Sequence, residues 1–195
     1  MREYIEARHG KGGWEKLLHV TGLQDRVYLA QAYPDYEAVR LLTAASAMSR
    51  QSLSGVLEEF GAFTVPALLT MYGHVIRPAW RSLDVIEHAE KAGHGLARQH
   101  EIGSTPPFLR ARRVAPHKLE LIYNSPRKWC AFAVGVGMGL GKHFEETVVA
   151  RHRVCMHDGA DHCEITYEVV GRPVSLEDSD PALAHAAPVR AHRPK

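Results

Sequence analysis

Three side chains that donate hydrogen bonds stand on alternate residues in the middle of the sequence: Tyr123, Ser125 and Arg127. Tyr123 and Ser125 share one face if a strand reaches that far, because side chains in a strand alternate between its faces. The Ser125-Pro126 pair predicts a helix beginning at Pro126, with Arg127 in its first turn. A guanidinium can grip a carboxylate through two hydrogen bonds, and a helix N-terminus also favours anions. The row suits the paired propionates of a porphyrin, although a strand-to-helix junction that merely caps itself is the alternative.

A histidine upstream of this row, His94, is a candidate metal ligand. It lies between Gly93 and Gly95, and each glycine weakens a helix by about 1 kcal/mol. Close approach of a flat ligand to the backbone is one reason to keep such glycines, whereas a frayed helix end with a solvated histidine is the alternative. His88 and His100 are equal rivals when the residue types are considered alone.

The cysteines form a second constellation, because all three fall in one pattern with a histidine: Cys130, His152, Cys155 and Cys163. Three thiolates and one imidazole make a closed tetrahedral shell for zinc, which leaves no open position for catalysis. His157 and His162 are rival fourth ligands. Three unlinked buried thiols are the alternative to a metal site.

Hydrophobic periodicity predicts helices in the first 100 residues and mainly strands after them. The helical segments lie near Trp14, over 35–48 and 52–69, and from Leu83 onward with Ser82 as the cap, the last carrying His88 and His94. Pro66 is expected to kink or end the third of them. A further helix is expected over 126–143. The predicted strands cover residues 108–114, 118–123, 147–155 and 163–170, with Asp158-Gly159 in the closing turn. This order of elements predicts an α+β fold.

Two low-complexity features carry no chemistry of their own. Glycines alternate over residues 135–141, but they lack the spacing and the preceding strand of a dinucleotide-binding loop, so they predict close helix packing. The segment 171–195 is rich in proline, alanine and charge, which predicts a disordered tail behind one domain over 1–170.

Bulk composition narrows the functional classes. The 195 residues are 45% hydrophobic and 24% charged, as in globular proteins, and the net charge of +2 gives no nucleic-acid footprint. The sequence has neither a run long enough to span a membrane nor a signal-peptide core, so a cytoplasmic protein is expected. No nucleophile–base pair stands out, and an enzyme is therefore not predicted.

The spacing of these residues resembles the H-NOX family (haem nitric oxide/oxygen-binding domains), in which an axial histidine precedes a Pro-Pro element and a Tyr-x-Ser-x-Arg motif follows. Counting back from Thr105-Pro106-Pro107 selects His94 over His88 and His100. The resemblance covers about residues 14–170 and includes four further segments: 14–18, 26–28, 60–63 and 155–163. It implies a helical N-terminal part packed on an antiparallel sheet with one long helix, and haem between them.

The resemblance assigns roles around haem b: iron ligation by His94, propionate binding by Tyr123, Ser125 and Arg127, and pressure on the macrocycle from Pro107. A nitric-oxide-sensing bacterial branch of the family has the same Cys–His–Cys–Cys spacing. That match favours His152 over His157 and His162 as the fourth zinc ligand.

The implied function is gas sensing. In the family, nitric oxide binds ferrous iron and weakens the iron–histidine bond, and the histidine's helix then moves. Oxygen-binding relatives carry a distal tyrosine where this sequence has Phe132, which predicts selectivity for nitric oxide over dioxygen. Relative to Trp14, the given sequence also starts about two helical turns later than family members usually do, so the expectation is either a more open wall on the gas-binding side of the haem or a misassigned start codon.

Output is expected through a separate partner chain, either a histidine kinase or a cyclic-di-GMP enzyme. Two other functions fit the sequence less completely. One is a zinc-stabilised, haem-free redox or interaction module, since thiolate ligands can be oxidised. The other is a small-molecule-binding domain of the 4-vinyl-reductase-like type.

Overall fold

The computed structural model describes residues 1–25, 34–91 and 105–171, so the predicted residues His94 and His100, the segment 26–28 and the tail beyond Gly171 lie outside it. The helices of the described part are α1 (Arg2–His9), α2 (Gly13–Thr21), α3 (Asp35–Ser49), α4 (Leu53–Met71), α5 (Ser82–Ala89), α7 (Cys130–His143) and a short 3-10 helix, η2 (Met156–Asp158). The strands are β1 (Phe108–Ala115), β2 (Lys118–Asn124), β3 (Thr147–Val154) and β4 (Cys163–Gly171).

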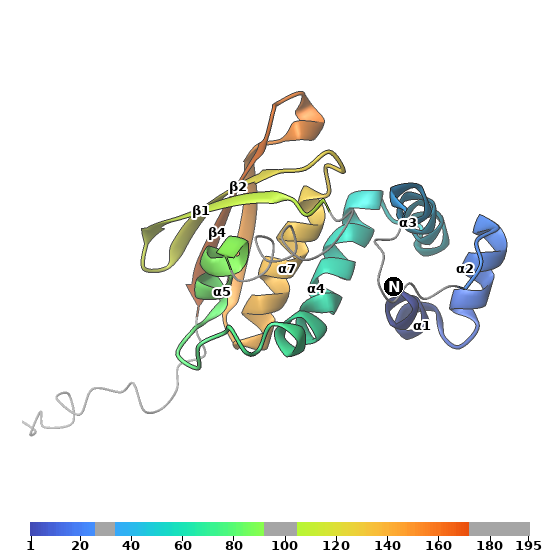
Figure 1. Cartoon of the computed structure of the whole chain (residues 1–195), viewed down its shortest axis with the longest axis horizontal. Helices are drawn as coiled ribbons and strands as arrows, with labels where there is room; N and C mark the ends of the chain where they lie inside the picture. The colour runs from blue at the N-terminus through green and yellow to red at the C-terminus, as the bar shows by residue number, and fades with distance from the viewer. Residues whose placement is uncertain (26–33, 92–104, 172–195) are drawn as a thin grey trace, which may run out of the picture.

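The four strands form one antiparallel sheet in the order β1-β2-β4-β3. Figure 1 shows α7 lying along the sheet, α4 packed on the other side of α7, and α1–α3 at the far end of the molecule. The predicted α+β class is confirmed by this arrangement. None of the helices in the described ranges is long and apolar enough to cross a membrane.

Two hydrophobic clusters meet at the α4–α7 pair. One lies between the sheet, α5 and α7, where Leu121, Ile165 and Tyr167 are almost wholly buried. The other joins α1–α4 around Ile5 and Leu17. The strand side chains follow the alternation that their sequence predicts, so β2 and β4 each turn one apolar face toward α7.

Glycines allow α4 and α7 to approach closely. A Cβ atom on Gly135 would lie 1.9 Å from the carbonyl oxygen of Glu58, and one on Gly61 would lie 2.3 Å from the carbonyl oxygen of Phe132. Of the alternating glycines, Gly135 and Gly139 therefore serve close helix packing, as their sequence predicts, whereas Gly137 and Gly141 meet side chains of β4 and β3.

Gly135→Ala is expected to destabilise the protein by about 3 kcal/mol, because a methyl group inserted against backbone forces the helices apart. Urea unfolding would measure this loss. Gly55→Ala is the matched control, since its Cβ would meet only side-chain atoms, the hydroxyl of Ser52 at 3.3 Å and the Cβ of Gln51 at 3.9 Å. Equal stability of the two variants would contradict the account of the helix contact.

Helix α7 begins at Cys130 and not at Pro126, so the prediction of its start was wrong. The carbonyl oxygen of Ser125 accepts a hydrogen bond from the N–H of Lys128 at 3.0 Å, which closes a turn. Lys128 then takes a left-handed backbone conformation with φ of 52°, and a right-handed helix cannot include such a residue. Arg127 consequently lies in a turn ahead of the helix rather than in its first turn.

Two smaller expectations concern the ends of helices. Of the two outcomes expected for Pro66, it does not end α4, which continues to Met71. Ser82 is the first residue of α5 and not its cap, and the carboxylate of Asp84 accepts the N–H of Arg81 at 2.9 Å instead. The closing turn between β3 and β4 does contain Asp158 and Gly159, as predicted.

Candidate haem cavity and cysteine cluster

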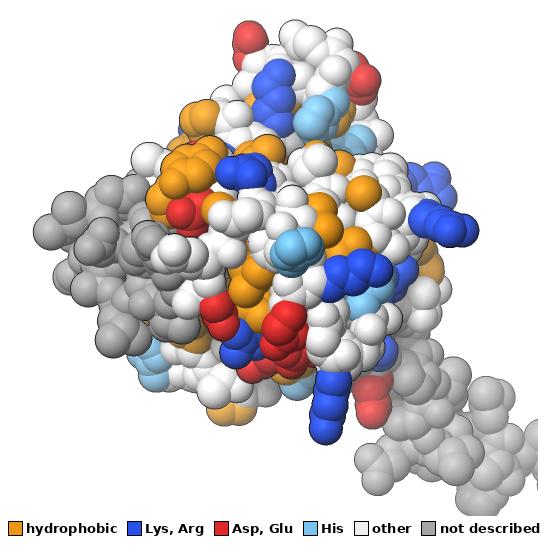
Figure 2. Space-filling model, turned by 90° about the vertical axis from the view of Figure 1, so that its right-hand side faces the viewer, with side chains coloured by type: hydrophobic (Ala, Val, Ile, Leu, Met, Phe, Trp, Pro, Cys, Tyr) orange, Lys and Arg blue, Asp and Glu red, His pale blue; other side chains and the backbone are white. Residues whose placement is uncertain are grey.

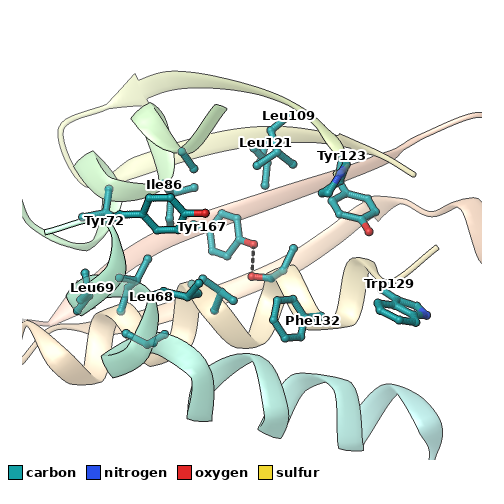
Figure 3. A pocket seen from close by; sticks show the side chains of 18 of the residues that line it. Leu68, Leu69, Tyr72, Ile86, Leu109, Leu121, Tyr123, Trp129, Phe132 and Tyr167 are labelled. Atoms are coloured by element: carbon teal, nitrogen blue, oxygen red, sulfur yellow. Dashed lines mark hydrogen bonds between the residues drawn. The ribbon is translucent and has the colours of Figure 1, made fainter. Parts of the chain in front are cut away.

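A cavity of about 380 Å³ lies between the sheet and the helices α4, α5 and α7. Its walls are largely apolar and aromatic. Figure 3 shows Tyr123 and Trp129 at one end and Leu69 and Tyr72 at the opposite end. Cavities of this size with apolar walls and few polar groups typically bind small molecules or cofactors.

Five of the residues that the sequence singled out line this one cavity: Pro107, Tyr123, Ser125, Arg127 and Phe132. They come from the segment before β1, the end of β2, the turn after it and α7. Four other lining side chains were not recognised from the sequence: Tyr72, Trp80, Trp129 and Tyr167. Only Tyr167 had a usable signal, because it follows the inward alternation of β4.

Tyr123 and Ser125 form the polar end of the cavity and are both buried. Burial raises the pKa of Tyr123 to about 12, with a smaller opposing effect from its hydrogen bond with Ser125. The phenol is therefore a neutral donor at every physiological pH. The Ser125 hydroxyl also accepts the N–H of Arg127 at 3.3 Å, which ties this end of the cavity to the turn.

Arg127 joins three parts of the chain at the same end. Its Nη1 and Nη2 donate to the carbonyl oxygen and the hydroxyl of Thr105 at 2.8 and 3.0 Å. Its Nε and Nη2 contact a carboxylate oxygen of Asp35, on α3, at 2.8 and 2.7 Å. The guanidinium also lies over the ring of Trp129. A second carboxylate placed at this rim would meet a cation that is already oriented.

The remaining wall offers few hydrogen-bond donors. Phe132 packs against Phe60 with ring centroids 5.7 Å apart, and its phenyl group has no donor. The hydroxyl of Tyr167 is already committed, because it donates to the carbonyl oxygen of Ala133 at 2.8 Å (Figure 3). A Cβ on Gly137 would lie 2.2 Å from the Tyr167 ring, so the ring occupies space that is free only because residue 137 has no side chain.

The histidine of α5, His88, does not line the cavity. Its ring stacks on Trp80 with centroids 4.3 Å apart, and its Nδ1 lies 2.9 Å from the carbonyl oxygen of Asp84. A ligand from the predicted set would have to come from His94 or His100, in the segment that follows α5.

The donor set fits haem. A porphyrin is flat and apolar over most of its surface and carries two carboxylates on one rim. The cavity has apolar walls between α7 and the sheet, and its cation and its two neighbouring hydroxyls gather at one end. Charge-assisted hydrogen bonds of this kind contribute about 1.5–3 kcal/mol each.

The four residues of the predicted zinc constellation come together near the start of α7. The ligand atoms of Cys130, His152, Cys155 and Cys163 all lie within 4.8 Å of one another. The Cys155 sulfur lies 3.9 Å from that of Cys130 and 3.8 Å from that of Cys163. A tetrahedral zinc with Zn–S bonds of about 2.3 Å separates its sulfurs by roughly 3.8 Å, so the spacing fits this metal.

The electrostatics of the cluster also favour a cation. Burial and the neighbouring thiols of Cys163 and Cys155 raise the pKa of the Cys130 thiol. Burial, followed by the charge of His157, lowers the pKa of His152, which keeps its imidazole neutral. Crowded thiols lose their protons when a metal ion supplies the compensating charge, and a neutral imidazole is the ligand form of histidine.

The two rival histidines are engaged elsewhere. The Nε2 of His157 lies 2.8 Å from the carbonyl oxygen of Lys128, and the ring of His162 lies 3.5 Å from the carboxylate of Glu164. Neither belongs to the cluster that the described residues form. Among the described histidines, His152 is the one that lies with the three thiols.

Comparison with known proteins places these features in a family. A family model described as haem-NO-binding (HNOB) matches residues 1–152 of the chain. A comparison with curated proteins found no match.

Solved structures of H-NOX proteins share the fold. One, from S. oneidensis in its Fe(II)NO ligation state, is 24% identical, with 87% of this chain and 94% of that chain covered and a TM-score of 0.77. A T. tengcongensis H-NOX variant is 20% identical, with 89% and 94% covered and a TM-score of 0.75. The predicted architecture of helices on a four-stranded antiparallel sheet is confirmed.

Proposed function

Because the chain belongs to the haem-NO-binding family, whose members are haem-based gas sensors, we propose that it senses nitric oxide through haem b held in the cavity between α4, α5, α7 and the sheet. One observation carries this proposal. A single cavity is lined by Pro107, Tyr123, Ser125, Arg127 and Phe132, which are scattered over 26 positions of sequence, and three of them, Tyr123, Ser125 and Arg127, lie together at one end.

In this proposal Tyr123, Ser125 and Arg127 bind the propionates, and Pro107 lies against the macrocycle. His94, which follows α5 in the sequence, would hold the iron through its imidazole. Haem bound here would supply a ferrous iron able to bind nitric oxide. The zinc held by Cys130, His152, Cys155 and Cys163 is structural.

Helix α5 is fixed to the sheet along its length, which limits what can move. Glu146, buried in the turn between α7 and β3, accepts the N–H and the hydroxyl of Ser82 at 3.2 and 2.5 Å. Arg113 on β1 contacts Asp84 and Glu87 at 2.7 and 2.9 Å. These contacts hold α5 in place, and we expect α5 to keep its position against the sheet when the gas binds.

The output partner would be a separate chain, a histidine kinase or a cyclic-di-GMP enzyme, by analogy with the family. Acidic and basic side chains are interspersed on the face that Figure 2 shows, with hydrophobic side chains scattered between them. A mixed surface of this kind favours a protein partner over the phosphate backbone of a nucleic acid.

Nitric oxide added to the ferrous protein tests the proposed function. The expected result is a shift of the Soret band, while exposure of the ferrous protein to dioxygen gives no stable complex. A haem-bound protein whose spectrum does not respond to nitric oxide would contradict the proposal.

Phe132→Tyr is expected to introduce dioxygen binding. A phenol at this position could donate to bound, partly anionic dioxygen, and such a bond contributes about 1.5–3 kcal/mol, or roughly ten- to a hundredfold in affinity. Oxygen titration of the ferrous variant measures the gain. Phe60→Tyr is the control from the neighbouring ring, which packs on Phe132 but does not line the cavity. An unchanged oxygen affinity in Phe132→Tyr would show that this ring does not face the gas.

A further inference from the structure

We infer that the cysteine cluster and the haem cavity are energetically coupled through the turn of residues 125–128, so that metal in the cluster tightens haem binding and haem in turn tightens metal binding. The inference rests on the proposed function of both sites. It goes beyond that function, because each site could bind its own ligand without any coupling to the other. Lys128, rather than a ligand of either group, is the residue that makes the link.

On the cavity side, the turn positions the rim that would hold the propionates. The Ser125 carbonyl oxygen accepts the N–H of Lys128 at 3.0 Å, and the Ser125 hydroxyl accepts the N–H of Arg127 at 3.3 Å. The Arg127 guanidinium then reaches Thr105, two residues before Pro107. A displacement of this turn would move the cation and one of the two hydroxyls together.

On the cluster side, Lys128 is held by the hairpin that carries two of the cysteines. Its Nζ donates to the carbonyl oxygen of Met156 at 3.2 Å, and its own carbonyl oxygen lies 2.8 Å from the ring of His157. The N–H of Met156 in turn donates to the Cys163 sulfur at 3.2 Å. The same Lys128 carbonyl oxygen lies 3.8 Å from the Cys130 sulfur.

The sheet provides a second, shorter route. Tyr123 on β2 stands directly opposite Cys163 on β4 in the antiparallel register. Directly opposed residues have Cβ atoms about 4.5–5.5 Å apart, so a displacement of one strand end displaces the end of its neighbour. An anchor of the cavity and a ligand of the cluster are thus cross-strand neighbours.

The coupling follows from the cost of ordering this region. A metal ion fixes the tip of the β3–β4 hairpin, and the tip fixes Lys128. Haem that then enters the cavity meets a turn that is already ordered, so the second binding event loses less conformational entropy. Thermodynamic linkage requires that each ligand change the affinity of the other by the same factor.

The experiment measures haem affinity by competition with a haem scavenger, for the full chain with zinc bound and after zinc is removed by a chelator. We expect removal of zinc to weaken haem binding by about fivefold or more, within the usual range of coupling between sites. Zinc affinity, measured with a metal indicator, is expected to fall by the same factor when haem is absent. Equal haem affinity in the two forms would overturn the coupling and leave the haem site intact, whereas a chain that never takes up haem would end both proposals.

Removal of zinc could weaken haem binding simply by unfolding the chain. A variant that keeps all four cluster residues tests the link without that effect. Lys128→Met removes the bond to Met156 and retains both the aliphatic stem and the four cluster residues. Its zinc-loaded form is expected to bind haem less tightly than the wild-type protein, and with a smaller response to zinc removal. Lys142→Met, on an exposed residue of the last turn of α7, is the control and should match the wild-type protein. A full response to zinc in Lys128→Met would overturn the role of Lys128.

Discussion

Cys155→Ser is expected to release the zinc and to cost about 4 kcal/mol or more of folding free energy, because loss of a structural metal is among the few single changes with effects of that size. Cys155 lies between the other two sulfurs, at 3.9 and 3.8 Å from them. In the proposed zinc site its thiolate would be one of the four ligands. For a chain of this length the melting temperature should fall by roughly 10 °C. Thermal unfolding and metal content of the purified variant measure both effects.

Histidine variants identify the fourth zinc ligand within the same experiment. His152→Ala is expected to lose zinc, whereas His162→Ala should retain it, since the His162 ring faces Glu164. Retention of a full equivalent of zinc by His152→Ala would remove this residue from the shell. Loss of zinc from His162→Ala alone would assign the ligand to that residue.

His94→Ala is expected to abolish axial ligation of the iron, which the absorption spectrum of the ferrous protein reports directly. The effect should be complete, because the cavity wall that the structure describes contains no histidine. Added imidazole should restore a histidine-like spectrum by occupying the vacated position. The variant should still bind haem, more weakly, through Tyr123, Ser125 and Arg127.

His88→Ala is the matched control for this assignment. The His88 ring does not line the cavity, although it stacks on Trp80, which does, so its removal should leave the ferrous spectrum unchanged. An unchanged spectrum in His94→Ala, with a changed one in His88→Ala, would mean that α5 turns its histidine to the iron and that the spacing rule fails in this chain.

The sheet could be predicted closely from the sequence, because side-chain alternation is a local property. The first two strands were expected over 108–114 and 118–123, and β1 and β2 extend only one residue further. The start of α7 could not be predicted in this way. Ser125-Pro126 has the local form of a helix start, but Lys128 is turned into the left-handed conformation and held there by contacts from the hairpin.

The candidate sites show the same division between local and long-range information. The spacing of Tyr123, Ser125 and Arg127 was visible in the sequence, and so was the cysteine pattern. The ion pair between Arg127 and Asp35 joins residues 92 positions apart, and the local sequence around either residue does not predict it. Tyr72 follows the end of α4 and Trp80 precedes α5, so neither belongs to a periodic segment that could have predicted its place in the cavity wall.

Titration of the metal-loaded, haem-free protein with hemin tests the central claim most directly. The account predicts that one equivalent saturates the protein and gives a Soret band, and that Arg127→Met weakens this binding by removing the cation at the rim. A preparation that stays colourless after hemin is added and the excess removed would contradict it, because the cavity would then not be a haem site.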